Sequence, residues 1–158
     1  MSKIRVAFNG MGRIGKNVMR VILSKLDDKF DIVAGNDLVS AEEIAKSLPK
    51  DSIYGRFPVD VTLKSENVIK VGRHDITVYA EKDAANIPWG KHDVDIVFEC
   101  TGLFRTADTA GKHIEAGARK VIISAPGQEV DNTIVYGVND DSLKSSDQVI
   151  SNASCTTN

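Results

Sequence analysis

The chain has 158 residues, of which 42% are hydrophobic and 27% charged, and its formal net charge is −2. That length is typical of one globular domain, no basic block suggests a nucleic-acid partner, and no stretch approaches the roughly 20 apolar residues of a membrane helix. Two cysteines and no long apolar leader argue against a secreted scaffold, so we expect a cytoplasmic protein without membrane partners or a metal site.

The first part of the chain alternates short apolar runs with helical patterns. Residues 4–8 predict a buried strand, and residues 31–34 predict a second one. Between them, apolar residues recur at helical spacing over residues 14–26, which predicts an amphipathic helix. A capping-box pattern that begins at Ser40 predicts a short helix ending at Pro49.

Residues 57–80 have a different character. Short runs at 59–61, 68–71 and 76–79 predict half-exposed strands, with Gly72 in a turn. We interpret this segment as an antiparallel insertion on one edge of the main sheet.

The last part of the chain returns to alternating elements, with a helix predicted over 106–116 that Gly117 ends. Alternation of strands and helices favours an α/β fold, a Rossmann-type doubly wound and mostly parallel sheet with a small antiparallel edge insertion. In such sheets ligands bind beyond the carboxyl ends of the strands. Further strands are expected at 94–98, 121–123, 133–136 and 149–150.

Three glycines, Gly10, Gly12 and Gly15, form the pattern G-x-G-x-x-G between a predicted strand and a predicted helix. This context is the one in which glycines let the backbone approach a pyrophosphate at a helix N-terminus. Asp37 ends the second strand, where a carboxylate can accept hydrogen bonds from a ribose diol and repel a 2′-phosphate. The pattern predicts an NAD site; the alternative is a chance recurrence of glycines with an ordinary loop aspartate.

Cys155 follows directly after the last predicted strand, among the hydroxyl residues Ser154, Thr156 and Thr157. If a helix begins there, its N-terminus stabilises a thiolate, and the hydroxyls can cap the helix or help to bind phosphate. An inert buried cysteine beside a serine–threonine cap fits the local sequence equally well. Cys100 ends a buried strand with no base nearby in sequence, and we interpret it as inert core.

Taken together, these segments resemble the glyceraldehyde-3-phosphate dehydrogenases. The similarity covers the whole chain in order, and its last octapeptide is highly specific. The matching segments are 9–15, Asn36-Asp37, Asp51-Ser52, 55–57, Pro88-Trp89, 116–126, 135–139 and 151–158.

The resemblance implies roles for particular residues. Cys155 is the implied catalytic nucleophile, with Ser154 and Thr156 binding the substrate or inorganic phosphate. Residues 1–150 are the implied NAD-binding domain, and residues 151–158 begin the catalytic segment. The implied cofactor-binding residues are Asn9, Gly10, Gly12, Arg13, Ile14, Gly15, Asp37, Lys82, Thr101, Gly102 and Ser124.

The implied activity is the phosphorylating, NAD-dependent oxidation of glyceraldehyde 3-phosphate to 1,3-bisphosphoglycerate, a step of glycolysis, through a cysteine thioester in a homotetramer. The family's catalytic histidine lies beyond Cys155, whereas His74, His92 and His113 all precede it and are interpreted as surface or structural. We therefore expect these 158 residues alone to be inactive and to be the cofactor-binding part of a longer parent enzyme.

Two alternatives remain open. One is an erythrose-4-phosphate dehydrogenase, which shares the glycine pattern and the cysteine segment. The other is a stand-alone NAD-binding module without turnover, against which the presence of residues 154–158 argues. The intact mass of the protein in its source would separate the module from a complete dehydrogenase.

Overall fold

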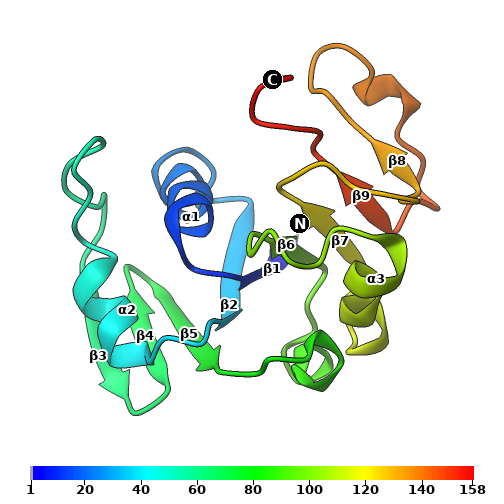
Figure 1. Ribbon diagram of the computed structural model, residues 1–158. Helices are drawn as coiled ribbons and strands as arrows, with labels where there is room; N and C mark the ends of the chain where they lie inside the picture. Colours follow the sequence, from blue (N-terminus) through cyan, green and yellow to red (C-terminus); the bar gives the residue numbers. More distant parts are fainter. Residues whose placement is uncertain (1) are drawn as a thin grey trace.

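The computed structural model describes residues 2–158 and contains one mixed sheet of nine strands in the order β3-β4-β5-β2-β1-β6-β7-β9-β8 (Figure 1). The strands are β1 (Ile4–Asn9), β2 (Phe30–Asn36), β3 (Val61–Ser65), β4 (Val68–Val71), β5 (His74–Tyr79), β6 (Ile96–Glu99), β7 (Lys120–Ile123), β8 (Asn132–Thr133) and β9 (Val149–Ser151).

Three α-helices and three short 3-10 helices connect the strands. They are α1 (Arg13–Lys25), α2 (Ala41–Ser47), α3 (Ala107–Glu115), η1 (Ala84–Asn86), η2 (Trp89–His92) and η3 (Asp140–Ser142). Among residues 2–158, no helix has both the length and the apolar character needed to cross a bilayer.

The sheet is doubly wound around β1 and β6. From β1 the chain passes through α1 to β2 on one side, and from β6 it passes through α3 to β7 on the other, with all these strands parallel. The strand order therefore reverses between β1 and β6, which is where open α/β sheets bind ligands. The α/β, Rossmann-type fold with a mostly parallel sheet is confirmed.

Both faces of the central sheet are buried, which explains the continuous apolar runs in its strands. Val6 and Phe8 of β1 point into the core under α1 and α2, whereas Ala7 between them points into the core under α3 and η2. Figure 1 shows α1 and α3 on opposite sides of β1 and β6. Side chains alternate across a strand, so neighbouring residues of β1 anchor different layers.

The predicted capping box forms at the start of α2. The Ser40 hydroxyl accepts a hydrogen bond from the Glu43 backbone N–H at 3.2 Å, and the Glu43 carboxylate accepts one from the Ser40 N–H at 3.3 Å. These bonds satisfy two N–H groups that a helix end leaves free.

The antiparallel insertion is confirmed, with β4 antiparallel to both of its neighbours and β5 joining the parallel sheet beside β2. The strand predicted at 59–61 is displaced to β3 at 61–65, so its predicted bounds were wrong. The bounds of β3 follow from its pairing with β4. A tight turn connects the two antiparallel strands and places Ser65 opposite Val68, so the residues that directly precede this turn form the strand. Val59 instead packs over Gly72 in the next turn.

The strand predicted at 133–136 was also wrong in extent, because β8 covers only Asn132–Thr133. The residues after Thr133 alternate in the way a strand does, but local hydrogen bonds and a glycine favour a turn there. The Asn139 side chain accepts a hydrogen bond from the Val135 N–H at 2.7 Å, and Gly137 has φ +78°. Residues 136–138 therefore form a turn.

Candidate functional site

One pocket lies at the carboxyl ends of the central strands, at the point where the strand order reverses. Its volume is about 530 Å³, and segments that follow β1, β2, β5 and β6 contribute to it. The residues that line it are Asn9, Gly10, Gly12, Asn36, Asp37, Leu38, Glu81, Lys82, Cys100, Thr101, Leu103 and Phe104.

The three glycines of the turn have three different reasons to lack a side chain. Gly10 has φ +90°, and a Cβ there would lie 2.9 Å from the Thr101 backbone nitrogen. At Gly15 a Cβ would lie 2.1 Å from the Gly10 carbonyl oxygen, so α1 could not approach β1 as it does. At Gly12 a Cβ would meet nothing within 4 Å. The open space at Gly12 is where a ligand can contact the backbone.

The N-terminus of α1 is suited to an anion. Gly12 is its cap residue and provides no side-chain hydrogen bond, and its first turn contains no acidic residue. A helix N-terminus carries free N–H groups and a partial positive charge, which together favour a phosphate group.

Asp37 connects the second strand to the glycine turn. Its Oδ2 accepts a hydrogen bond from the Met11 backbone N–H at 2.7 Å, and its Oδ1 accepts one from the Val39 N–H at 3.1 Å. The Asp37 carboxylate therefore accepts hydrogen bonds from nearby backbone, as a loop aspartate does, and it also lines the pocket, as a ribose-binding residue must.

The structure brings six of the predicted cofactor residues together on the pocket wall. Gly15 lies directly beneath them, and Gly102 follows Thr101 in the adjoining loop with φ +75°. The Ser124 backbone N–H donates to the carbonyl of Glu99 at 3.0 Å, next to Cys100, which itself lines the pocket. The six are Asn9, Gly10, Gly12, Asp37, Lys82 and Thr101.

The side chains of Arg13 and Ile14 point elsewhere. Arg13 forms an ion pair with Asp51 at 2.5 Å and lies over the ring of Tyr54, 5.6 Å from its centroid. Ile14 is 47% exposed and borders a separate apolar groove along α1 with Val18. The backbone N–H groups of these two residues lie at the N-terminus of α1, where a phosphate can bind.

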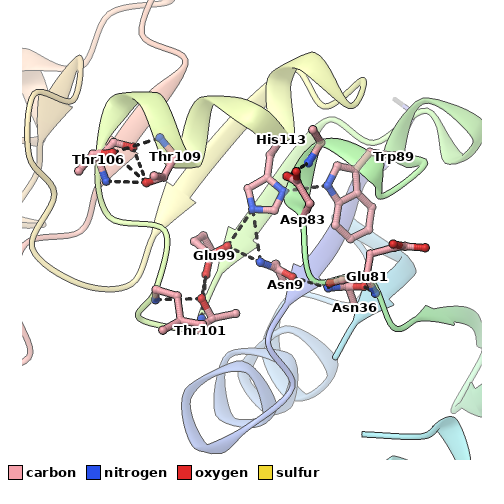
Figure 2. A network of polar contacts seen from close by, with 12 residues as sticks. Asn9, Asn36, Glu81, Asp83, Trp89, Glu99, Thr101, Thr106, Thr109 and His113 are labelled. Atoms are coloured by element: carbon pink, nitrogen blue, oxygen red, sulfur yellow. Dashed lines mark hydrogen bonds and ion pairs between the residues drawn. The ribbon is translucent and has the colours of Figure 1, made fainter. Parts of the chain in front are cut away.

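A buried polar network lies behind the pocket (Figure 2), and the sequence reasoning missed its centre. Glu99, at the end of β6, accepts hydrogen bonds from the Asn9 side chain at 2.5 Å, from the Thr101 N–H at 2.8 Å and from the Thr101 hydroxyl at 2.5 Å. His113 lies 2.8 Å from Glu99 and 2.9 Å from the Trp89 indole nitrogen. Glu99 is 1% exposed and His113 is fully buried.

The network continues along the same edge of the sheet. The Asn36 amide donates to Asn9 Oδ1 at 2.8 Å and to the Glu81 carbonyl at 2.9 Å, and Asn36 Oδ1 accepts from the Glu81 N–H at 2.8 Å. Side chains thus link the ends of β6, β1, β2 and β5. The sequence contains a signal for this network, because a carboxylate that ends a buried strand needs donors.

Cys155 is exposed and lies in the turn that follows β9. Ser154 begins this turn, because its hydroxyl accepts a hydrogen bond from the Thr157 N–H at 3.0 Å and its carbonyl accepts one from the Asn158 N–H at 3.2 Å. Ala153 has φ +56°, a left-handed conformation that is unfavourable for alanine. Such strain occurs most often at functional sites.

The two cysteines differ in burial. Desolvation raises the pKa of the Cys100 thiol to about 12, a hydrogen bond from Ser124 acting in the opposite direction. Cys155 is exposed, which contradicts the burial expected in the alternative interpretation of this residue. The thiolate is the reactive form of cysteine.

Alkylation of the folded protein with iodoacetamide should therefore modify Cys155 and leave Cys100 largely intact at pH 8 to 9. Burial keeps Cys100 protonated throughout that range, and unfolding should make it reactive. Peptide mass spectrometry after timed quenching measures both sites, with the protein in urea as control. Equal labelling of the two cysteines in the folded protein would contradict the assignment.

All three histidines have partners away from Cys155. His74 contacts Asp27 at 2.6 Å, His92 contacts Tyr79 at 2.7 Å and His113 belongs to the network around Glu99. Among residues 2–158, no histidine is hydrogen-bonded to Cys155, and no three His, Cys, Asp or Glu side chains are grouped as they would be to hold a metal ion.

Comparison with known proteins is consistent with this site. Residues 4–107 match the family model described as glyceraldehyde 3-phosphate dehydrogenase, NAD binding domain. The chain is 50% identical over 158 residues to the plasmid-encoded glyceraldehyde-3-phosphate dehydrogenase of Cupriavidus necator, with 98% of this chain and 46% of the relative covered.

Two other relatives carry the same name. The chain is 47% identical over 156 residues to the protein of Zymomonas mobilis, covering 98% of this chain and 46% of the relative. It is 48% identical over 159 residues to the protein of Mycobacterium tuberculosis, covering 98% of this chain and 47% of the relative. The chain spans about half the length of the curated relatives it matches. It belongs to the glyceraldehyde 3-phosphate dehydrogenase family, and its residues 4–107 correspond to the NAD-binding domain of that family.

Proposed function

We propose that the protein containing this chain oxidises glyceraldehyde 3-phosphate with NAD and inorganic phosphate, forming 1,3-bisphosphoglycerate. The observation that carries the proposal is the combination at one edge of the sheet of an open glycine turn, a pocket bordered by Asp37, and the exposed Cys155 just after β9. A pure binding module has no use for an exposed thiol in a hydroxyl-rich turn.

NAD fits the residues present. The space at Gly12 and the uncapped end of α1 accommodate a pyrophosphate, with the backbone N–H groups of Arg13 and Ile14 donating to it. Asp37 accepts hydrogen bonds from the adenosine ribose. Lys82 is exposed at the pocket rim, where its charge favours the phosphates.

The remaining assigned residues frame the nicotinamide side. Thr101 and Gly102 form the wall that follows β6, and Ser124 follows β7. When bound, NAD accepts a hydride. Ser151, whose hydroxyl donates to the Ala125 carbonyl at 2.7 Å and accepts from the Gly127 N–H at 3.0 Å, ties the start of the cysteine segment to the loop after Ser124.

The chemistry at Cys155 proceeds by covalent catalysis. The Sγ thiolate adds to the aldehyde carbon, and the resulting oxyanion takes up a proton to give a thiohemiacetal. Loss of hydride from that carbon, together with the hydroxyl proton, leaves a thioester on Sγ. An oxygen of inorganic phosphate then attacks the thioester carbonyl and expels the thiolate, releasing the acyl phosphate.

Ser154 and Thr156 are the residues proposed to bind the substrate or the attacking phosphate. Their hydroxyls lie 2.9 Å apart and flank Cys155. Hydroxyl and backbone N–H groups of such a turn can donate to phosphate oxygens. The proton acceptor for the thiol must come from outside the three histidines of this chain, because each has another partner.

The proposal is tested by following NADH absorbance with the native protein, NAD and glyceraldehyde 3-phosphate, with and without inorganic phosphate. Sustained NADH formation that requires phosphate supports it. Erythrose 4-phosphate as substrate is the matched comparison, and a clear preference for that tetrose would overturn the assigned substrate.

Asp37 should determine the preference for NAD over NADP. In the Asp37→Ser variant, the ratio of NADP to NAD dissociation constants is expected to fall at least about tenfold, because a charge that repels the 2′-phosphate and accepts from the ribose is removed. Loss of the hydrogen bond from the Met11 N–H could also distort the turn, which would weaken the binding of NAD and NADP alike. The ratio of the two dissociation constants therefore reports only the effect of the Asp37 charge. Calorimetric titration measures both constants, and an unchanged ratio would count against this role.

We also propose that the protein acts in the cytoplasm as a homotetramer, as the family resemblance implies. Exposed apolar side chains support an interface, since Tyr136 is 83% exposed and Val138 is 78% exposed in the turn after β8. Sedimentation equilibrium of the native protein measures the number of subunits.

A further inference from the structure

His113 is a buried histidine that the proposed chemistry does not use. It lies on α3, is fully buried and does not border the pocket. We propose that His113, through Glu99, is a positioning residue for the cofactor, holding the two walls of the NAD pocket at their working separation. The inference rests on the NAD pocket assigned above.

The two shorter hydrogen bonds of His113 define its tautomer, and a third, longer contact joins its Nε2 to the Asn9 amide nitrogen at 3.4 Å. The indole nitrogen of Trp89 can only donate, and it donates to His113 Nδ1 at 2.9 Å. Nδ1 is therefore an acceptor, and the proton of the neutral ring resides on Nε2. Nε2 then donates to Glu99 Oε2 at 2.8 Å. Trp89 is fully buried, so this orientation of the ring has no competition from solvent.

Both oxygens of Glu99 act as acceptors. Oε2 receives the His113 N–H and the Asn9 amide, and Oε1 receives the Thr101 N–H and hydroxyl. Four donors stabilise a carboxylate at a site that is 1% exposed. Removing one donor from a buried charge is unfavourable, so the remaining donors and the carboxylate must rearrange.

The two residues that share Glu99 with His113 are Asn9, at the end of β1, and Thr101, after β6, and both line the pocket. Figure 2 shows both residues beside Glu99. Asn9 precedes the glycine turn, and its Oδ1 holds Asn36 of the neighbouring strand. Thr101 begins the loop of the other wall, and its hydroxyl accepts a hydrogen bond from the Leu103 N–H at 3.0 Å. A Cβ at Gly10 would contact the Thr101 backbone nitrogen at 2.9 Å, so the walls touch at this point. A shift of Glu99 therefore changes both walls together.

A buried histidine can also be purely structural, and a matched pair of double variants separates the two roles. Trp89→Phe with His113→Gln removes the indole donor but keeps an N–H that can reach Glu99. Trp89→Phe with His113→Leu removes the indole donor and leaves Glu99 without its fourth donor. The NAD dissociation constant of each folded variant is measured by calorimetry at a temperature well below its unfolding midpoint.

We expect the double variant with His113→Leu to bind NAD at least about tenfold more weakly than the wild type. The double variant with His113→Gln should recover most of that loss in affinity. Ile69→Ala, in the fully buried core of β4 away from the pocket, should lower the unfolding midpoint with little change in affinity. Equal affinities in the two double variants would overturn the proposal. If the wild type itself fails to bind NAD, the pocket assignment fails first and this inference fails with it.

A measurement on the wild type does not depend on the folding of any variant. ¹⁵N spectra of histidine-labelled protein should show the His113 ring protonated on Nε2 and not on Nδ1. Because Asn9 and Thr101 line the pocket and share Glu99 with His113, saturating NAD should shift the Nε2 resonance although the ring lies outside the pocket. A proton on Nδ1, or no shift on saturation, contradicts the proposed role.

Discussion

Replacing Cys155 with serine is expected to lower the rate of phosphate-dependent NADH formation by roughly a thousandfold or more. A serine hydroxyl is a far weaker nucleophile than a thiolate, because it is hardly ionised near neutral pH. The rate constant is measured with saturating NAD and glyceraldehyde 3-phosphate, using the native protein.

Two controls make this result specific. The NAD dissociation constant should stay within about twofold of the wild type, because Cys155 does not line the cofactor pocket. Cys100→Ser removes the other thiol and should keep the rate within an order of magnitude. Retention of activity by the Cys155 variant, or loss of activity only in the Cys100 variant, would show that Cys155 is not the nucleophile.

Replacing Gly15 with alanine is expected to impair both folding and cofactor binding. A Cβ at this position would lie 2.1 Å from the Gly10 carbonyl oxygen, so α1 must move away from β1. Overpacking of this kind lowers the free energy of unfolding by about 1–3 kcal/mol, which for a chain of this size lowers the midpoint by roughly 3–10 °C. Thermal unfolding by circular dichroism measures the change.

Gly12→Ala is the matched control in the same turn. A Cβ there meets nothing within 4 Å, and the backbone angles of φ −80° and ψ −151° are extended, so the midpoint should change little. NAD affinity should nevertheless fall, because the new methyl group occupies the space assigned to the pyrophosphate. An unchanged NAD affinity in Gly12→Ala would argue that the cofactor does not approach this part of the turn.

The sequence predicted the central layers well, because their signals are local. Apolar runs of β1 and β6 and the helical spacing of α1 depend only on neighbouring residues. The two strands with wrong predicted bounds lie where pairing with a distant strand, or a side-chain hydrogen bond, sets the ends of the strand. β3 is positioned by its partner strand, and β8 ends where Asn139 closes a turn.

The candidate site was predictable in outline and not in its supporting contacts. Glycine spacing and Asp37 indicated the cofactor turn, and the family resemblance indicated Cys155. The pairing of Glu99 with His113 joins residues 14 positions apart in different elements, and its bond to Asn9 spans 90 positions. No periodicity encodes such contacts, because they exist only after the strands have been ordered in the sheet.

The two side-chain amides that are linked to the Glu99 carboxylate have a consequence for the thermodynamics of binding. Asn9 and Asn36 are at most 4% exposed and are already hydrogen-bonded in the free protein, so their conformational entropy is lost on folding and not on binding. A ligand that enters between preordered walls retains more of its interaction energy as affinity. Association can then proceed in a single step, at a rate limited by diffusion and orientation and not by rearrangement of the strand ends.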